Sequence, residues 1–130
     1  MRAVDTNVLV RLITRDDPSQ LTAAEAFVAK GAWVPYLAIV EATWVLAAVY
    51  DRDRATIATA VEMLLHHDQL TVQDSEIVAA AVAHFRHHAG TDFSDCLMLE
   101  IARKAGHVPM GTFDRALGKV DGAHMLRRAP

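Results

Sequence analysis

The feature of this sequence that most constrains its fold is a repeated alternation of two patterns. Short apolar runs alternate with longer stretches whose apolar residues recur at helical spacing. Strands that alternate with helices in this way form a mostly parallel sheet, because each helix carries the chain back to the same edge. Helices then cover both faces of the sheet. The pattern therefore predicts an α/β fold, an α/β/α sandwich with a central sheet of four or five short strands.

The expected elements are bounded by residues that start or stop helices. Asp17 or Ser19, on either side of Pro18, is typical of a helix start. Glycines are typical of helix ends, because glycine readily adopts the left-handed backbone found there. The expected helices cover residues 8–13, 18–30, 37–50, 53–67, 74–89 and 94–105. The expected strands cover residues 3–4, 33–34, 70–72 and 108–112, with residues 125–126 as a candidate fifth strand.

Length and composition indicate one soluble domain. The chain has 130 residues, 52% of them hydrophobic, and no linker interrupts it, so a single domain spanning residues 1–130 is expected. No run approaches the roughly 18 apolar residues of a membrane-spanning helix, and the start of the chain lacks a secretory pattern. The single cysteine, Cys96, is expected in the core of a cytoplasmic protein, since it has no partner for an internal disulfide.

Net charge counts mildly against a nucleic-acid partner. Thirteen basic residues stand against sixteen acidic ones, which gives a net charge of −3 and no basic footprint. If several acids line a metal site, however, divalent cations would neutralise them locally.

Several aspartates stand where α/β sheets commonly bind ligands. Asp5 directly follows an expected strand and Asp114 lies two residues after another, and ligands of open α/β sheets bind at the carboxyl ends of strands. Asp95 lies in the first turn of its helix, where the helix dipole favours an anion, and Asp92 precedes it by three residues. Taken singly, each of these acids is more simply explained as a helix cap or a turn residue.

Glu41 is harder to explain as an ordinary surface residue. It interrupts the nearly continuous apolar stretch 37–50, which is expected to form a buried helix. A buried carboxylate without a partner is costly, so Glu41 would need a cation, a proton or a metal ion. An ion pair and a metal ligand remain equal alternatives at this point.

Four short motifs, taken in order, carry a resemblance to a known family. They are Val-Asp-Thr-Asn-Val-Leu-Val (4–10), Glu-Ala-Thr-Trp-Val-Leu (41–46), Asp-Phe-Ser-Asp (92–95) and Thr-Phe-Asp (112–114). In order and spacing the set resembles the motifs of PIN-domain nucleases. More narrowly, it resembles the toxins of VapBC-type toxin–antitoxin pairs. The resemblance extends from residue 2 to about residue 120, nearly the whole chain.

The resemblance implies a metal-dependent endoribonuclease that hydrolyses RNA phosphodiester bonds and is inhibited by a cognate antitoxin. In the family, four acids coordinate one or two Mg²⁺ or Mn²⁺ ions. The matching positions, both catalytic and metal-binding, are Asp5, Glu41, Asp95 and Asp114. The supporting positions are Asn7, Asp92 and Thr112, with Asp92 also an alternative ligand. The sequence departs from the family at Pro35 and Tyr36, where a serine or threonine is usual.

The resemblance also implies protein partners. A homodimer is expected, formed by apolar faces of the helix at 18–30 and of the helix that carries Trp44. The antitoxin is expected to lay a C-terminal segment across the acidic edge and to offer Arg or Lys to the carboxylates. The candidate contacts to RNA phosphates are basic residues near that edge in sequence, namely Arg11, Arg15, Arg103, Lys104, Arg115 and Lys119.

The sequence also offers three alternatives. A haloacid-dehalogenase-like phosphatase also begins with an aspartate after its first strand, but needs a second aspartate where this chain has Asn7. His84 and His88 have the spacing of a helical zinc pair, yet surface histidines are the simpler interpretation. A non-catalytic PIN-fold module that only binds a protein is opposed by the four intact acids.

Overall fold

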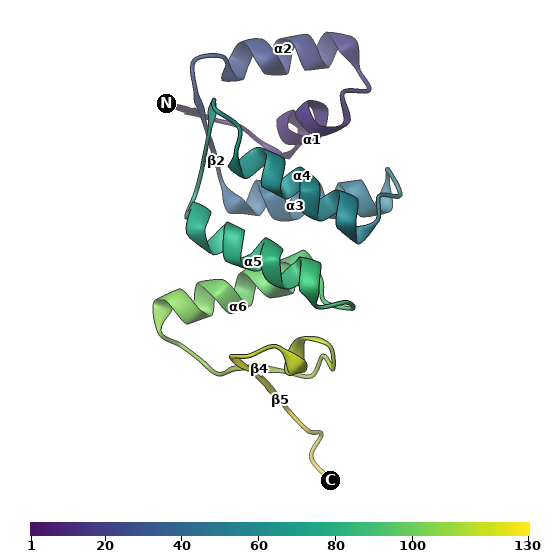
Figure 1. The fold of residues 1–130 in the computed structure, drawn as a ribbon, viewed down its shortest axis with the longest axis vertical. Coiled ribbons are helices and arrows are strands. Elements are labelled where there is room, and N and C mark those ends of the chain that lie inside the picture. Colours follow the sequence, from purple (N-terminus) through teal and green to yellow (C-terminus); the bar gives the residue numbers. More distant parts are fainter. The chain divides into compact units, whose positions relative to one another are not determined.

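The structure is a computed structural model that describes all residues, Met1–Pro130 (Figure 1). The chain divides into two compact units, Met1–Ser75 and Glu76–Pro130, and each is described by itself. The expectation of one domain over residues 1–130 stays a prediction. None of the helices combines the length and the apolar character needed to cross a bilayer.

The first unit contains a parallel sheet and four complete helices. In chain order the elements are β1 (Arg2–Ala3), α1 (Thr6–Thr14), α2 (Pro18–Val28), β2 (Ala32–Val34), α3 (Tyr36–Ala48), α4 (Arg54–Leu65) and β3 (Leu70–Val72). The strands run in the order β1-β2-β3, with Ala3 paired to Trp33 and Trp33 paired to Thr71. Helix α1 packs against both α2 and α3, so the carboxyl end of β1 leads directly into the packed helices.

The second unit contains two helices and a parallel strand pair. Its elements are α5 (Ser75–His87), α6 (Phe93–Ala105), β4 (Met110–Thr112), the short 3-10 helix η1 (Leu117–Lys119) and β5 (Ala123–Met125). Strand β4 pairs with β5 in register, Met110 opposite Ala123. The five strands thus form a three-stranded and a two-stranded set, and every pairing is parallel. The expectation of an α/β fold with parallel strands is confirmed.

Local capping explains where three of the six helices begin. The side chains of Asp5, Asp17 and Asp53 each accept a hydrogen bond from the backbone N–H three residues later, at 3.2, 3.0 and 2.8 Å. Such N-caps satisfy a donor that the helix leaves unpaired. Helix α6 ends at Gly106, whose φ of 83° lies in the left-handed region that glycine adopts without strain.

Each unit has its own apolar core. In the first unit, Leu9 and Ile39 are completely buried and Leu46 nearly so, which packs α1 against α3. In the second unit, Cys96 and Leu99 on α6 are buried to the same degree. The expectation that Cys96 is a core residue is therefore confirmed.

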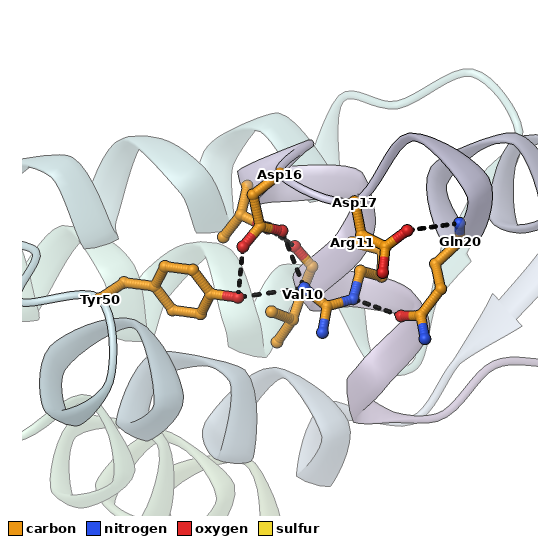
Figure 2. A network of polar contacts seen from close by, with 7 residues as sticks. Val10, Arg11, Asp16, Asp17, Gln20 and Tyr50 are labelled. Carbon is orange, nitrogen blue, oxygen red and sulfur yellow. Dashed lines mark hydrogen bonds and ion pairs between the residues drawn. The ribbon is translucent and has the colours of Figure 1, made fainter.

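A polar network holds α1 to the segments that follow it (Figure 2). Arg11 donates from Nη1 to Asp16 Oδ1 at 2.8 Å and to the Tyr50 hydroxyl at 3.0 Å, and from Nε to Gln20. The Tyr50 hydroxyl donates to Asp16 Oδ2 at 2.9 Å. Arg11 thus joins α1, the start of α2 and the end of α3. This structural role argues against the phosphate contact expected for it.

Loss of the Asp16 charge is expected to weaken this network in a pH-dependent way. The pKa of Asp16 lies below its ordinary value, mainly because Thr14 and Tyr50 donate hydrogen bonds to the carboxylate, with Arg11 contributing less. A lowered carboxyl pKa stabilises the fold above the unfolded-state pKa, and that stability is lost as pH falls through the folded-state pKa. Asp16→Asn should therefore lower the melting temperature at pH 7, and the difference from wild type should vanish in acid. Thermal melts across pH test this, with exposed Asp68→Asn as control. A difference that persists unchanged to acid pH would contradict it.

Candidate active site

In the first unit, two of the expected site acids lie on packed helices. Asp5 follows β1 and caps α1, with its Oδ1 accepting from the Val8 N–H. The next residue, Thr6, donates from Oγ1 to Glu41 Oε2 on α3 at 2.8 Å. Because α1 packs on α3, the first turn of α1 is fixed beside the middle of α3. Asp5 and Glu41 are therefore linked through Thr6.

Glu41 is exposed, which corrects the sequence-based expectation of a buried carboxylate. The helix that carries it does not bury its whole circumference. One stripe of α3 faces solvent, since Leu37 and Trp44 are 59% and 54% exposed, and Glu41 lies between them at helical spacing. The stripe is not apparent from the apolar run 37–50, because Leu37 and Trp44 are themselves apolar. Glu41 is exposed to solvent, accepts a hydrogen bond from the Thr6 hydroxyl and forms no ion pair.

In the second unit, three aspartates influence one another. Asp92 is the N-cap residue of α6, although its side chain makes no capping hydrogen bond, and Asp95 lies in the first turn. Asp114 follows β4, where its N–H donates to Thr112 Oγ1 at 3.0 Å and its Oδ1 accepts from the Leu117 N–H at 2.9 Å. Partial burial raises the pKa of Asp95, and the negative charges of Asp92 and Asp114 raise it further.

Neutralising Asp95 is expected to stabilise the metal-free protein. A raised carboxyl pKa means that the folded state disfavours the Asp95 charge, so stability falls as pH rises through the Asp95 titration. In EDTA at pH 7, Asp95→Asn should raise the melting temperature. At acid pH, where the wild-type carboxyl is protonated, the gain should disappear. Thermal melts at both pH values test this. A lower melting temperature at pH 7 would contradict it.

The donor set suits a hard divalent cation. Asp5, Glu41 and Asp114 each use one carboxylate oxygen in a hydrogen bond within the protein and leave the other oxygen without one. Magnesium and manganese prefer such oxygen ligands. A cation beside Asp95 would lower its pKa, which partial burial and the charges of Asp92 and Asp114 raise. As the side chains stand, no three His, Cys, Asp or Glu residues lie close enough together to hold a metal ion.

The expected supporting residues differ in their surroundings. Thr112 accepts the Asp114 N–H and so helps to fix that turn. Asn7 is exposed on α1 and lines a hollow with Gln20 and Phe27 of α2, and it makes no hydrogen bond to an acid. At Tyr36, where the sequence departs from the resemblance, the backbone N–H donates to Gln73 Oε1 at 3.1 Å.

Most of the basic residues expected at RNA are already paired within the protein. Arg15 pairs with Glu25 at 3.5 Å and Lys104 with Glu76 at 2.6 Å. Arg103 donates to the Asp121 carbonyl oxygen at 2.6 Å. Arg115 and Lys119 form no ion pair and remain the best placed of the expected phosphate contacts.

Sequence reasoning missed a buried acid on α6. Glu100 is 7% exposed, and its Oε1 lies 2.9 Å from His84 Nε2, while its Oε2 lies 3.4 Å from Arg103 Nε. This pairing gives His84 a structural role and accounts for it without zinc. The signal available in the sequence was a glutamate between Leu99 and Ile101, the same pattern that drew attention to Glu41.

The chain matches a known protein family. A family model described as PIN domain matches residues 2–123, which is nearly the whole chain. Searches of curated proteins and of solved structures gave no match.

Proposed function

Because the chain belongs to the PIN-domain family, whose members are generally nucleases, we propose that it is a Mg²⁺- or Mn²⁺-dependent endoribonuclease of the VapC toxin type. The observation that carries the proposal is the hydrogen bonding and the surroundings of the carboxylates at the family's motif positions. Asp5, Glu41 and Asp114 each keep a carboxylate oxygen free of protein hydrogen bonds, and Asp95 is partly buried beside the negative charges of Asp92 and Asp114.

Asp5, Glu41, Asp95 and Asp114 would hold the cation. When bound, a divalent ion lowers the pKa of water and stabilises negative charge on a phosphate. The chain's own residues prepare this chemistry. Thr6 fixes the direction of the Glu41 carboxylate, and the Leu117 N–H and Thr112 fix the turn that carries Asp114. Asp92 adds negative charge beside Asp95 and so strengthens the preference of the cluster for a cation.

The proposed activity is tested with the purified full chain. It should cut structured RNA in Mg²⁺ or Mn²⁺, and EDTA should stop the reaction without unfolding the protein. Sequencing of RNA ends after brief induction in cells would identify the substrate, with the Asp5→Asn variant as the reference. Cleavage that persists in EDTA would overturn the metal-dependent mechanism.

We also propose two protein partners, in a cytoplasmic setting where RNA is available. A cognate antitoxin would inhibit the nuclease by offering Arg or Lys to the free carboxylate oxygens. A second copy would cover the exposed stripe of α3, where Leu37 and Trp44 leave apolar surface in water. Light scattering should show a dimer for wild type and a smaller species for Trp44→Ala. A monomeric wild type would exclude the dimer, and failure of any co-expressed antitoxin to rescue growth would count against the toxin type.

A further inference from the structure

The second unit contains an open hollow that the carboxylate chemistry does not use. It has a volume of about 790 Å³ and is formed where the segments that follow β4 and β5 lie side by side. Its wall combines apolar and cationic side chains, and no carboxylate takes part. The lining residues are Phe113, Arg115, Met125, Leu126, Arg127 and Arg128.

The aromatic ring in this hollow is unusually accessible. Phe113 is 65% exposed, whereas Phe85 and Phe93 of the same unit are buried and pack against each other. Exposure of a large apolar ring is unfavourable unless something covers it. Met125 and Leu126, which are 37% and 39% exposed, extend the apolar surface beside the ring.

The charges in the hollow are all positive and unpaired. Arg115, Arg127 and Arg128 line it, and none of them forms an ion pair or a hydrogen bond within the protein. This differs from Arg11, Arg15 and Arg103, whose guanidinium groups are engaged elsewhere. Three free guanidinium groups around an exposed ring form a surface complementary to an anion that also carries a flat apolar face.

We propose that this hollow binds one nucleotide of a single-stranded RNA, with the base stacked on Phe113 and the flanking phosphates held by Arg115, Arg127 and Arg128. The inference rests on the proposed ribonuclease function and extends it to a substrate subsite. Stacking on aromatic rings tolerates any base, so the subsite selects unpaired strands rather than a sequence.

The position of Phe113 in the chain favours RNA over an acidic protein segment. Phe113 is followed directly by Asp114, and consecutive Cα atoms lie only about 3.8 Å apart. A base on Phe113 would therefore bind the same turn that carries an acid of the proposed catalytic set. An acidic peptide would also pair with the arginines, but it has no need of an exposed ring next to that acid.

The test is RNA binding in EDTA, which requires neither metal nor cleavage. Fluorescence anisotropy would follow a short, labelled, single-stranded RNA, and a 2-aminopurine base would report stacking. Phe113→Leu keeps an apolar side chain but loses the stacking face, so Kd should rise at least about fivefold and 2-aminopurine quenching should be lost. Phe113→Trp should retain both.

The arginines are tested through the salt dependence of binding. Each phosphate contact to a single strand contributes about 0.7 to the slope of log Kd against log salt concentration. Arg127→Gln combined with Arg128→Gln should therefore weaken binding and reduce that slope by about 1.4. Arg52→Gln, which removes an exposed arginine outside the hollow, is the matched control and should leave the slope unchanged.

The possible results separate this subsite from the nuclease itself. The subsite would be overturned if wild type does not bind RNA in EDTA, or if all variants bind RNA equally well. It would also be overturned if an acidic peptide binds the hollow and RNA cannot displace it. Cleavage in Mg²⁺ is measured independently. Wild-type cleavage with unchanged binding by the variants would reject only the subsite. If wild type and the variants bind RNA as predicted but wild type does not cleave it in Mg²⁺, only the nuclease proposal is rejected.

Discussion

Asp5→Asn is expected to reduce RNA cleavage by at least about 100-fold while the melting temperature changes little. Asparagine removes the negative charge that the proposed cation site requires. It keeps a side-chain oxygen that can accept the Val8 N–H, so the N-cap of α1 survives. Single-turnover cleavage of a labelled RNA in Mg²⁺ measures the effect, and a thermal melt confirms that the variant is folded.

Asp53→Asn provides the matched control for this prediction. Asp53 caps α4 as Asp5 caps α1, with its side chain accepting from the Thr56 N–H at 2.8 Å, but it has no proposed role in metal binding. The same substitution at an equivalent cap should therefore leave cleavage near the wild-type rate. Equal losses in both variants would mean that Asp5 acts through the helix rather than through a cation.

The order and kind of the elements were predictable because their signals are local. Capping by Asp17 and termination at Gly106 depend on neighbouring residues alone. Helix α2 begins after Asp17 and helix α6 ends before Gly106, as the sequence predicts. The ends of α2 and α5 were placed about two residues too late, because Gly31 and Gly90 lie slightly beyond the helices they follow. The family match over residues 2–123 agrees with the resemblance drawn from the four motifs.

The environment of the candidate acids was less predictable because it depends on packing between distant segments. Glu41 was expected to be buried, yet the packing of α3 leaves its stripe exposed and brings Thr6 to its carboxylate. The Glu100 pairing with His84 joins α6 to α5, which no local pattern encodes. The exposed ring of Phe113 was likewise invisible, since an aromatic residue beside a strand is usually a core residue.

Leu99→Ala is expected to cause the largest loss of stability, about 2–5 kcal/mol of the free energy of unfolding. Leu99 on α6 is completely buried and forms an apolar cluster with Leu117 and Val120 in and after η1. Truncation removes buried apolar surface and leaves a cavity that the neighbouring side chains fill only in part. Urea unfolding measures the change, and Met98→Ala, which truncates a 51% exposed neighbour on the same helix, should change stability little.

The same cluster links stability to the proposed chemistry. Leu99 lies one turn beyond Asp95, and Leu117 donates its N–H to Asp114, so the Leu99–Leu117 contact fixes two site acids relative to each other. Leu99→Met nearly conserves side-chain volume and should cost less than about 1.5 kcal/mol, which keeps the protein folded. We expect Leu99→Met to raise the Mg²⁺ concentration needed for cleavage more than Met98→Ala does. If both variants titrate with Mg²⁺ like wild type, the cluster stabilises the unit without positioning its acids.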